Sequence, residues 1–198
     1  MWFATETEVL EWLARNEWNY GIRADGVALY YTEPEADCLE LKFPETPLRV
    51  THLARIASML GISDESLFYG AVLWITLSQI GSPQLEKSGW KLIEKMRQGF
   101  GENRSLQVAS GHFFRDDELD DLAAFLVPCF VYAWDAYLIP NARNDFFAYL
   151  SHNQYWGVVA RTKEAYEGLA IELKELNPKE SQGMRERFCR PQKPTPKT

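Results

Sequence analysis

The sequence is poor in the residues that build disulfide frameworks and metal sites, with three cysteines and three histidines among 198 residues. Cys38, Cys129 and Cys189 lie far apart in the chain, and no two of them form a CxxC pair. Neither a zinc motif nor a redox motif is therefore predicted. Reduced thiols are typical of cytoplasmic proteins, so we expect the protein in the cytoplasm.

Long apolar runs are absent as well. The longest uncharged apolar stretch, residues 122–134, contains Pro128. It is shorter than the roughly 20 residues that a membrane-spanning helix needs. The first residues lack the basic start and the long apolar segment of a secretory signal peptide. We expect a soluble protein that does not associate with membranes.

The common catalytic and nucleotide-binding motifs are missing too. The sequence contains no HExxH, HxxEH, GxSxG or GxxxxGK motif and no Rossmann glycine pattern. These motifs place a metal, a nucleophile or a phosphate at a defined backbone position, so their absence weakens the case for an enzyme. We expect no cofactor and no resident metal.

Charge, by contrast, is plentiful and unevenly distributed. The chain carries a formal net charge of −7. Residues 178–198 contain six Lys or Arg and two Glu, a net of +4, so residues 1–177 carry −11. An acidic body repels the phosphate backbone of nucleic acids and attracts basic proteins. We expect a basic protein partner and no nucleic-acid binding.

Residues 178–198 are predicted to form a flexible, basic tail. They contain four prolines and few apolar side chains, so they can bury little surface. Residues 1–177 have the apolar content and the length of one folded domain. The sequence therefore predicts a single globular domain at 1–177 followed by this tail.

The densest apolar and aromatic segment is 110–161, which we expect to form the core. A helix is predicted to begin after Asp116 or Asp117 as its N-cap and to kink or end at Pro128. Three strands are predicted to follow, at 134–139, 145–151 and 155–161. Because the links between them are short, the strands must be antiparallel neighbours.

The other elements follow from hydrophobic periodicity and turn residues. Helices are predicted at 6–17, behind a Thr-x-x-Glu capping box, at 50–60, at 85–100 and after Thr162. Strands are predicted at 27–32 and 38–43, paired as a hairpin, at 66–81 and at 105–109. The predicted fold class is α+β, a single domain with a mostly antiparallel sheet packed against four to five helices.

Residues 53–67 have the spacing of a helix-turn-helix motif, with Ala57 and Gly61 at the crossing and the turn. Two features contradict a DNA-binding role. The second helix would begin with Asp64 and Glu65, which repel DNA, and the following residues prefer a strand. We interpret the segment as a helix, a glycine stop and a strand.

His112 is the first candidate for chemistry. It follows Ser110 and Gly111 and precedes an acidic helix start, where Asp116 and Asp117 could orient its ring as a general base or a metal ligand. The alternative is a loop histidine that hydrogen-bonds the backbone. The alternative is favoured, because most single histidines have no catalytic role.

His152 and Asp135 are the other candidates. His152 is predicted at the tip of a hairpin, where it and Asn153 tolerate the positive φ that a tight turn requires. Asp135 is the one charge in an apolar stretch, and on a strand its side chain points opposite to those of its neighbours, so we expect it to face water. If it is buried instead, it needs a partner and becomes a functional candidate.

The function predicted from the sequence is that of a non-enzymatic binding or inhibitor protein. Its acidic surface would engage a basic partner, by analogy of charge and size with an immunity protein. The alternative is a hydrolase or a metal-dependent enzyme that uses His112, His152 and Asp135, because zinc accepts such nitrogen and oxygen ligands. The two hypotheses differ in whether these three side chains meet.

Overall fold

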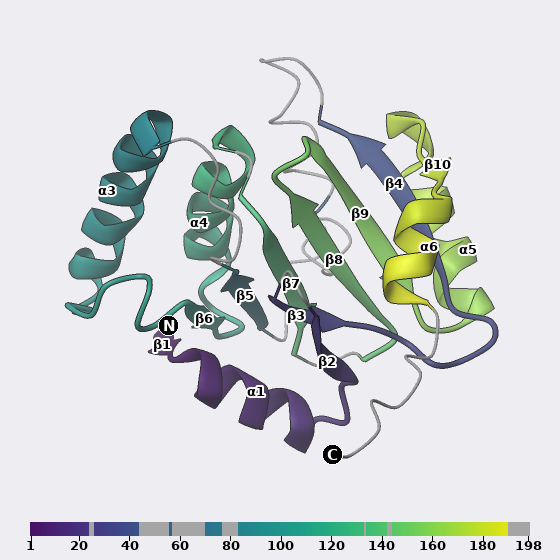
Figure 1. Cartoon of the computed structure of the whole chain (residues 1–198), viewed down its shortest axis with the longest axis horizontal. Coiled ribbons are helices and arrows are strands. Elements are labelled where there is room, and N and C mark those ends of the chain that lie inside the picture. Colours follow the sequence, from purple (N-terminus) through teal and green to yellow (C-terminus); the bar gives the residue numbers. More distant parts are fainter. Residues whose placement is uncertain are drawn as a thin grey trace.

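The computed structural model describes residues 1–23, 26–43, 56, 70–76, 83–132, 134–141 and 144–189. These residues form one α+β domain (Figure 1). The elements are β1 (Trp2–Ala4), α1 (Glu6–Arg15), β2 (Tyr20–Arg23), β3 (Gly26–Leu29), β4 (Asp37–Lys42), β5 (Ala71–Ile75), α3 (Pro83–Gly99), β6 (Gly111–Phe114), α4 (Leu119–Val131), β7 (Ala136–Pro140), β8 (Phe146–Ser151), β9 (Tyr155–Ala160), α5 (Lys163–Glu172), a 3-10 turn (Lys174–Leu176), β10 (Lys179–Glu180) and α6 (Gln182–Phe188).

An eight-stranded sheet with antiparallel pairing throughout is the centre of the domain, in the order β1-β6-β5-β7-β8-β9-β4-β10. The predicted C-terminal meander is confirmed, because β7, β8 and β9 are consecutive neighbours in this order. The strand predicted at 66–81 is confirmed for 71–75, as β5. Both margins of the sheet are short strands, β1 at one side and β10 at the other.

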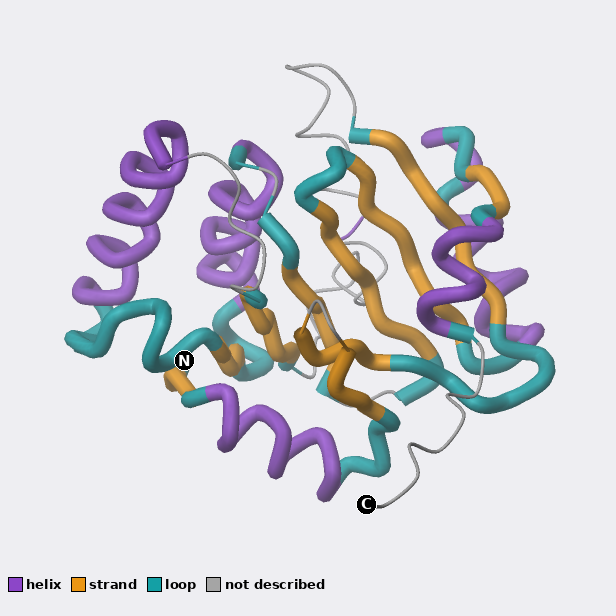
Figure 2. The backbone as a smooth tube through the Cα atoms, in the orientation of Figure 1, coloured by secondary structure: helices purple, strands orange, loops and turns teal. Residues whose placement is uncertain are grey.

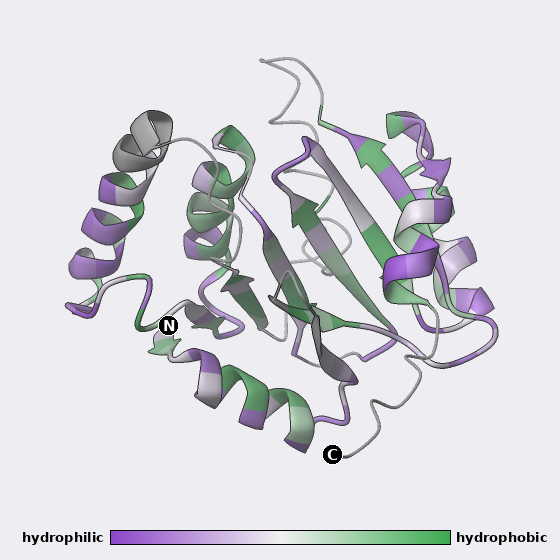
Figure 3. Ribbon diagram, viewed as in Figure 1, coloured by the Kyte–Doolittle hydropathy of each residue, from purple (hydrophilic) through white to green (hydrophobic). Residues whose placement is uncertain are grey.

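Both faces of the sheet are buried, so the central strands carry apolar side chains at nearly every position (Figure 3). Helices α3, α4 and α5 pack on one face, and α1, α6 and the β2–β3 ribbon pack on the other (Figure 2). Neighbouring residues of β8 therefore enter different cores: Phe146, Ala148 and Leu150 enter one, and Phe147 and Tyr149 enter the other.

Side-chain caps fix the starts of two helices where the sequence predicts them. Thr5 and Glu8 form the predicted capping box at the start of α1. The hydroxyl of Thr162 accepts the backbone N–H of Ala165 at 3.2 Å and caps α5. Both caps satisfy N–H groups that a helix cannot pair internally.

The predicted hairpin between 27–32 and 38–43 is wrong. The first of these segments contributes β3, which pairs with β2 in a separate two-stranded ribbon. The second contributes β4, which joins the main sheet beside β9. Adjacency in sequence therefore indicated the wrong partner, because all six residues of β4 pair with β9 of the meander.

The start of α4 also differs from the prediction, and of the two effects predicted for Pro128 the helix end does not occur. The N-cap is Glu118, without a side-chain cap hydrogen bond, so neither Asp116 nor Asp117 caps the helix. The helix continues through Pro128 to Val131. Pro128 and its neighbours Cys129 and Phe130 are buried, and this packing offsets the backbone hydrogen bond that proline cannot donate.

Part of the predicted flexible tail is folded instead. Residues 179–180 form β10, and residues 182–188 form α6, with Met184 and Phe188 buried in a core. The carbonyl of Phe188 accepts the backbone N–H of Tyr31 at 2.8 Å. Two apolar side chains at helical spacing thus hold a segment whose overall composition is polar.

Two further predictions fall on different structure or on residues outside the described part. Residues 105–109 are turn and not strand, and the strand lies just beyond them as β6. The predicted helix at 50–60, apart from Ile56, and the helix-turn-helix spacing at 53–67 lie mostly outside the described residues. Among the described helices, none is long and apolar enough to cross a membrane.

Candidate functional site

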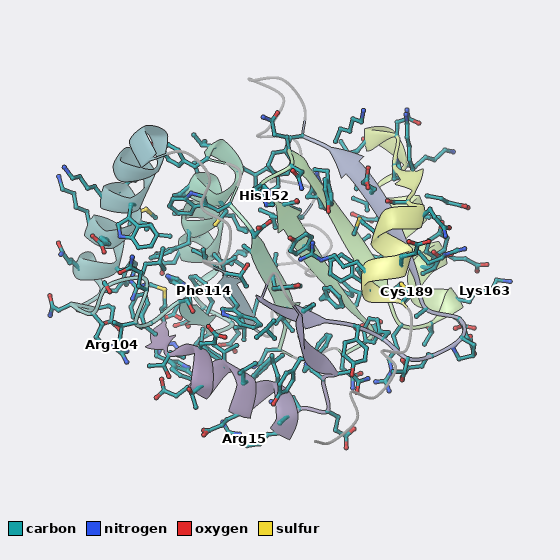
Figure 4. The ribbon with its side chains drawn as sticks, viewed as in Figure 1. Arg15, Arg104, Phe114, His152, Lys163 and Cys189 are labelled. Carbon is teal, nitrogen blue, oxygen red and sulfur yellow. The ribbon has the colours of Figure 1, made fainter. Side chains whose placement is uncertain are left out.

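The structure brings together two of the three side chains that the sequence singles out. Oδ2 of Asp135 lies 2.8 Å from Nδ1 of His152. Asp135 directly precedes β7, and His152 begins the turn between β8 and β9. Figure 4 shows His152 at one end of these central strands, close to the surface.

Asp135 is buried, at 7% exposure, so the expectation that it faces water is wrong. Its carboxylate accepts three hydrogen bonds: the imidazole contact, the His152 backbone N–H at 3.0 Å and the Tyr149 hydroxyl at 2.8 Å. The side chain points into the core formed by Tyr137 and Tyr149, on the face covered by α6. A buried carboxylate needs such donors to offset its lost hydration.

Tyr149 is a member of this site that the sequence analysis missed. Its burial, followed by the negative charge of Asp135, raises the pKa of the phenol far above its usual range. The hydroxyl therefore stays protonated and donates to the carboxylate. The predicted antiparallel pairing of the 134–139 and 145–151 strands could have indicated it, because Tyr149 pairs with Tyr137, two residues after Asp135.

The His152 ring is fixed at one nitrogen and partly exposed, with about a third of its side chain accessible to solvent. Of the two neutral tautomers of the ring, the carboxylate at Nδ1 selects the one with its proton on Nδ1, and this tautomer has a lone pair on Nε2. This arrangement can orient a general base. The positive φ of the turn lies at Gln154 (φ 61°), two residues after His152.

His112 lies elsewhere and is no loop residue. It occupies β6, is completely buried, and packs edge-on to the Phe3 ring. Its Nδ1 lies 3.2 Å from the Leu73 carbonyl and 3.0 Å from the Ser110 carbonyl, so Nδ1 carries the proton. Burial, with a contribution from the Arg97 charge, lowers the pKa of the imidazole to about 3.

The structure does not bring His112 together with Asp135 and His152, because the His112 ring packs against Phe125 in one core and Asp135 is hydrogen-bonded to Tyr149 in the core on the other face. None of the contacts described for His112 is with the other two side chains. Within the described residues, no three His, Cys, Asp or Glu side chains gather as they would around a metal ion. Asp135 and His152 alone can orient one imidazole and stabilise the β8–β9 turn.

The solvent-facing side of α4 forms a second candidate site. Asp120, Ala124, Val127 and Val131 follow one another at helical spacing, and all four are exposed. We call these four residues the α4 stripe. Val127 is 41% exposed and Val131 is 53% exposed.

The acidic residues that precede the α4 stripe extend it at one end. Asp116 and Asp117 are exposed, and Asp117 lies 3.3 Å from Arg115 in a solvated ion pair. Because neither aspartate caps the helix, both carboxylates face solvent. The stripe thus passes from negative charge to exposed valines over about 16 Å of helix.

Comparisons with known proteins do not change this description. No family model matches the chain, and searches of curated proteins and of solved structures also find no match.

Proposed function

We propose that the protein is a non-enzymatic binding protein that engages a basic partner protein through the α4 stripe. The observation that carries this proposal is the exposure of Val127 and Val131 in line with Asp120. A helix on the surface of a monomer normally turns polar residues to solvent, and α4 does so only at its start. Exposed apolar side chains beside charge are typical of interfaces.

The proposed partner carries Lys or Arg next to an apolar patch. The valines would supply the desolvated centre of the contact, where most binding energy arises. Asp116, Asp117 and Asp120 would lie at its rim and accelerate association with a basic surface. The net charge of −11 on residues 1–177 favours the same partner over a longer range. An inhibitor of a basic protein is one such function.

The test is capture of a protein by the immobilised chain at low and high salt. Val131→Ser and the double variant Asp116→Asn/Asp120→Asn alter the proposed surface. Ile171→Ser is the matched control, because Ile171 on α5 is 76% exposed and lies outside the stripe. We expect Val131→Ser to weaken binding by about tenfold or more and the double variant to reduce the association rate and its salt dependence.

The outcome that refutes this function is equally specific. A captured protein whose binding is unchanged by the α4 variants, or is weakened equally by Ile171→Ser, does not use the stripe. A binding strength that is independent of salt rules out the charge complementarity.

A second candidate function is hydrolysis with His152 as the general base, which the Asp135–His152 hydrogen bond favours. Here Asp135 would hold the ring, and Nε2 would take a proton from water or from a substrate hydroxyl. Its test is hydrolysis of a panel of activated esters by the wild type and by His152→Gln. His112→Gln is the control, because His112 is buried apart from the pair. Equal rates for His152→Gln and the wild type reject this candidate.

A further inference from the structure

Two cysteines that are far apart in the sequence, Cys38 and Cys189, lie near each other where α6 packs on β4. Cys38 lies in β4 and is buried, whereas Cys189 follows the last residue of α6 and is partly exposed. Cys38 is part of the core on this face and Cys189 packs against it, and the Cys189 side chain interacts with the Cys38 thiol and raises its pKa. Figure 4 shows Cys189 at the end of α6, well away from His152.

Several polar contacts hold α6 in the position that brings the thiols together. The Arg185 guanidinium pairs with the Asp37 carboxylate, with Nε at 3.0 Å from Oδ1. The hydroxyl of Ser181 donates to Glu40 at 2.6 Å, and the Cys38 thiol donates to the Ser181 carbonyl at 3.5 Å. Asp37 and Glu40 lie on either side of Cys38 in β4, and both of their partners in or next to α6 precede Cys189. The approach of the thiols is thus fixed by the packing of α6 on β4.

A pocket of about 480 Å³ opens beside Cys189, and only this thiol of the pair lines it. Its walls come from the segment before β4, from α5 and from α6. Lys163 and Arg185 provide positive charge, and Glu35, Asp37 and Glu167 provide negative charge. A small disulfide such as glutathione disulfide carries both ammonium and carboxylate groups, which match such a mixed lining.

The two thiols differ in reactivity. The side-chain interaction with Cys189, and then burial, raise the pKa of the Cys38 thiol far above its usual range. The protonated Cys38 is a poor nucleophile, so it does not react first. Cys189 is the thiol that a reagent in the pocket can reach.

We propose that Cys38 and Cys189 form a dithiol switch that closes into a disulfide between β4 and α6. The Cys189 thiolate attacks one sulfur of glutathione disulfide, and one glutathione thiolate leaves. The Cys38 thiolate then attacks the Cys189 sulfur of the mixed disulfide, and the second glutathione leaves. In total the protein loses two protons and two electrons, and glutathione disulfide takes them up to become two glutathione molecules.

The first step prepares the second. Once Cys189 is part of a mixed disulfide, it can no longer interact with Cys38 as a thiol or carry a negative charge beside it. Both effects hold Cys38 protonated in the reduced protein, so their loss favours its thiolate. Burial keeps Cys38 out of reach of external reagents throughout.

The test is oxidation of the full chain with glutathione disulfide, followed by alkylation and mass spectrometry without reductant. We expect the mass to fall by two hydrogen atoms. A tryptic map should contain residues 24–42 linked to residues 188–197, because Arg190 and Lys193 precede proline and resist cleavage. Amide hydrogen exchange in α6 should slow by about tenfold, because the new bond restrains its opening.

Three variants separate the roles of the cysteines. Cys38→Ser should stop at a stable glutathione adduct on Cys189, and Cys189→Ser should remain unmodified. Cys129→Ser is the matched control, because Cys129 is buried in α4 and burial raises the pKa of its thiol to about 12. It should form the disulfide like the wild type.

A wild-type time course makes the test independent of how well the variants fold. The adduct on Cys189 must rise and then decay as the internal disulfide appears. An adduct that accumulates without decay, or an adduct on Cys38 in Cys189→Ser, overturns the proposal.

Discussion

Asp135 holds His152 twice, through the imidazole Nδ1 at 2.8 Å and through the backbone N–H at 3.0 Å. One buried carboxylate therefore fixes both the side chain and the main chain of the residue that starts the β8–β9 turn. The Tyr149 hydroxyl completes the set at 2.8 Å. Whatever His152 does, its position depends on this carboxylate.

Replacing Asp135 should therefore destabilise the fold. Asp135→Asn keeps the shape of the side chain but puts an amide N–H where a carboxylate oxygen accepted a hydrogen bond. Two donors then face each other, and both are buried without an acceptor. We expect the free energy of unfolding to fall by about 2–4 kcal/mol, measured by urea denaturation at neutral pH. Asp120→Asn, on the exposed α4 stripe, should change it by less than about 0.5 kcal/mol. Equal effects of the two substitutions would contradict this role.

His112 should make the stability depend on pH below neutrality. Its folded pKa of about 3 lies below its ordinary value of 6.5, because burial disfavours the charged ring. Between these values the unfolded chain binds more protons, so stability is complete above pH 6.5 and falls as the pH falls. The expected slope is up to about 1.4 kcal/mol per pH unit.

Urea denaturation at pH 7 and pH 5 checks the slope. His112→Gln keeps an N–H donor but does not titrate, so its stability should decline less over the same range. Chemical shifts of the His112 ring should remain those of the neutral form at pH 5. An imidazole that titrates near pH 6.5 in the folded protein refutes the prediction.

Arg97 should be difficult to replace, because it is completely buried and its guanidinium donates hydrogen bonds to backbone carbonyls. It donates to the Ala109 carbonyl at 2.5 Å and to the Arg104 carbonyl at 3.3 Å. Burial lowers its pKa to about 10, which still leaves it charged at neutral pH. Arg97→Met leaves both carbonyls without these donors, and we expect a loss of about 2–4 kcal/mol in thermal or urea unfolding.

The control for Arg97→Met is Arg15→Met, because Arg15 is exposed on α1. It should change the free energy of unfolding by less than about 0.5 kcal/mol. If Arg97→Met proves as stable as this control, the buried guanidinium contributes only packing.

Gly157 in β9 should tolerate no side chain. A Cβ at this position would lie 2.4 Å from the Leu39 carbonyl oxygen and 2.5 Å from Cε of Met184. Gly157→Ala therefore forces β4 or α6 away, and we expect a loss of about 1–3 kcal/mol. Gly168→Ala in α5 meets nothing within 4 Å and should gain up to about 1 kcal/mol. Thermal unfolding of the two variants should shift in opposite directions.

The elements that the sequence predicted well are those decided by local chemistry. The Thr5 and Thr162 caps and the short links of the β7–β9 meander each depend on a few adjacent residues. Pairing between distant strands depends on the whole sheet, so β4 was assigned to the wrong neighbour. The α6 segment was missed because Met184 and Phe188 are two apolar residues in a basic, proline-containing stretch.

The sequence indicated two residues of the candidate site, His152 and Asp135, but not the burial of Asp135. His152 was placed correctly at its turn, but Asp135 was expected to face water because its side chain alternates with those of its apolar neighbours along the strand. Its burial follows from α6, which covers that face of the sheet and whose position the sequence did not indicate. His112 looked like a loop residue because it follows Ser110 and Gly111 and comes just before the acidic start of the predicted helix. In the structure that glycine lies in β6, opposite Ala4 of β1.

The two short strands at the margins of the sheet, β1 and β10, occupy the backbone groups of the longer strands beside them. β1 covers the four-residue β6, and β10 covers part of the six-residue β4. Trimming the first five residues, or cutting the chain ahead of β10, would bare backbone N–H and C=O groups along a longer strand. Such bare strands pair with one another between molecules. Proteolysis that removes either short strand would thus expose a longer sheet edge through which molecules can aggregate.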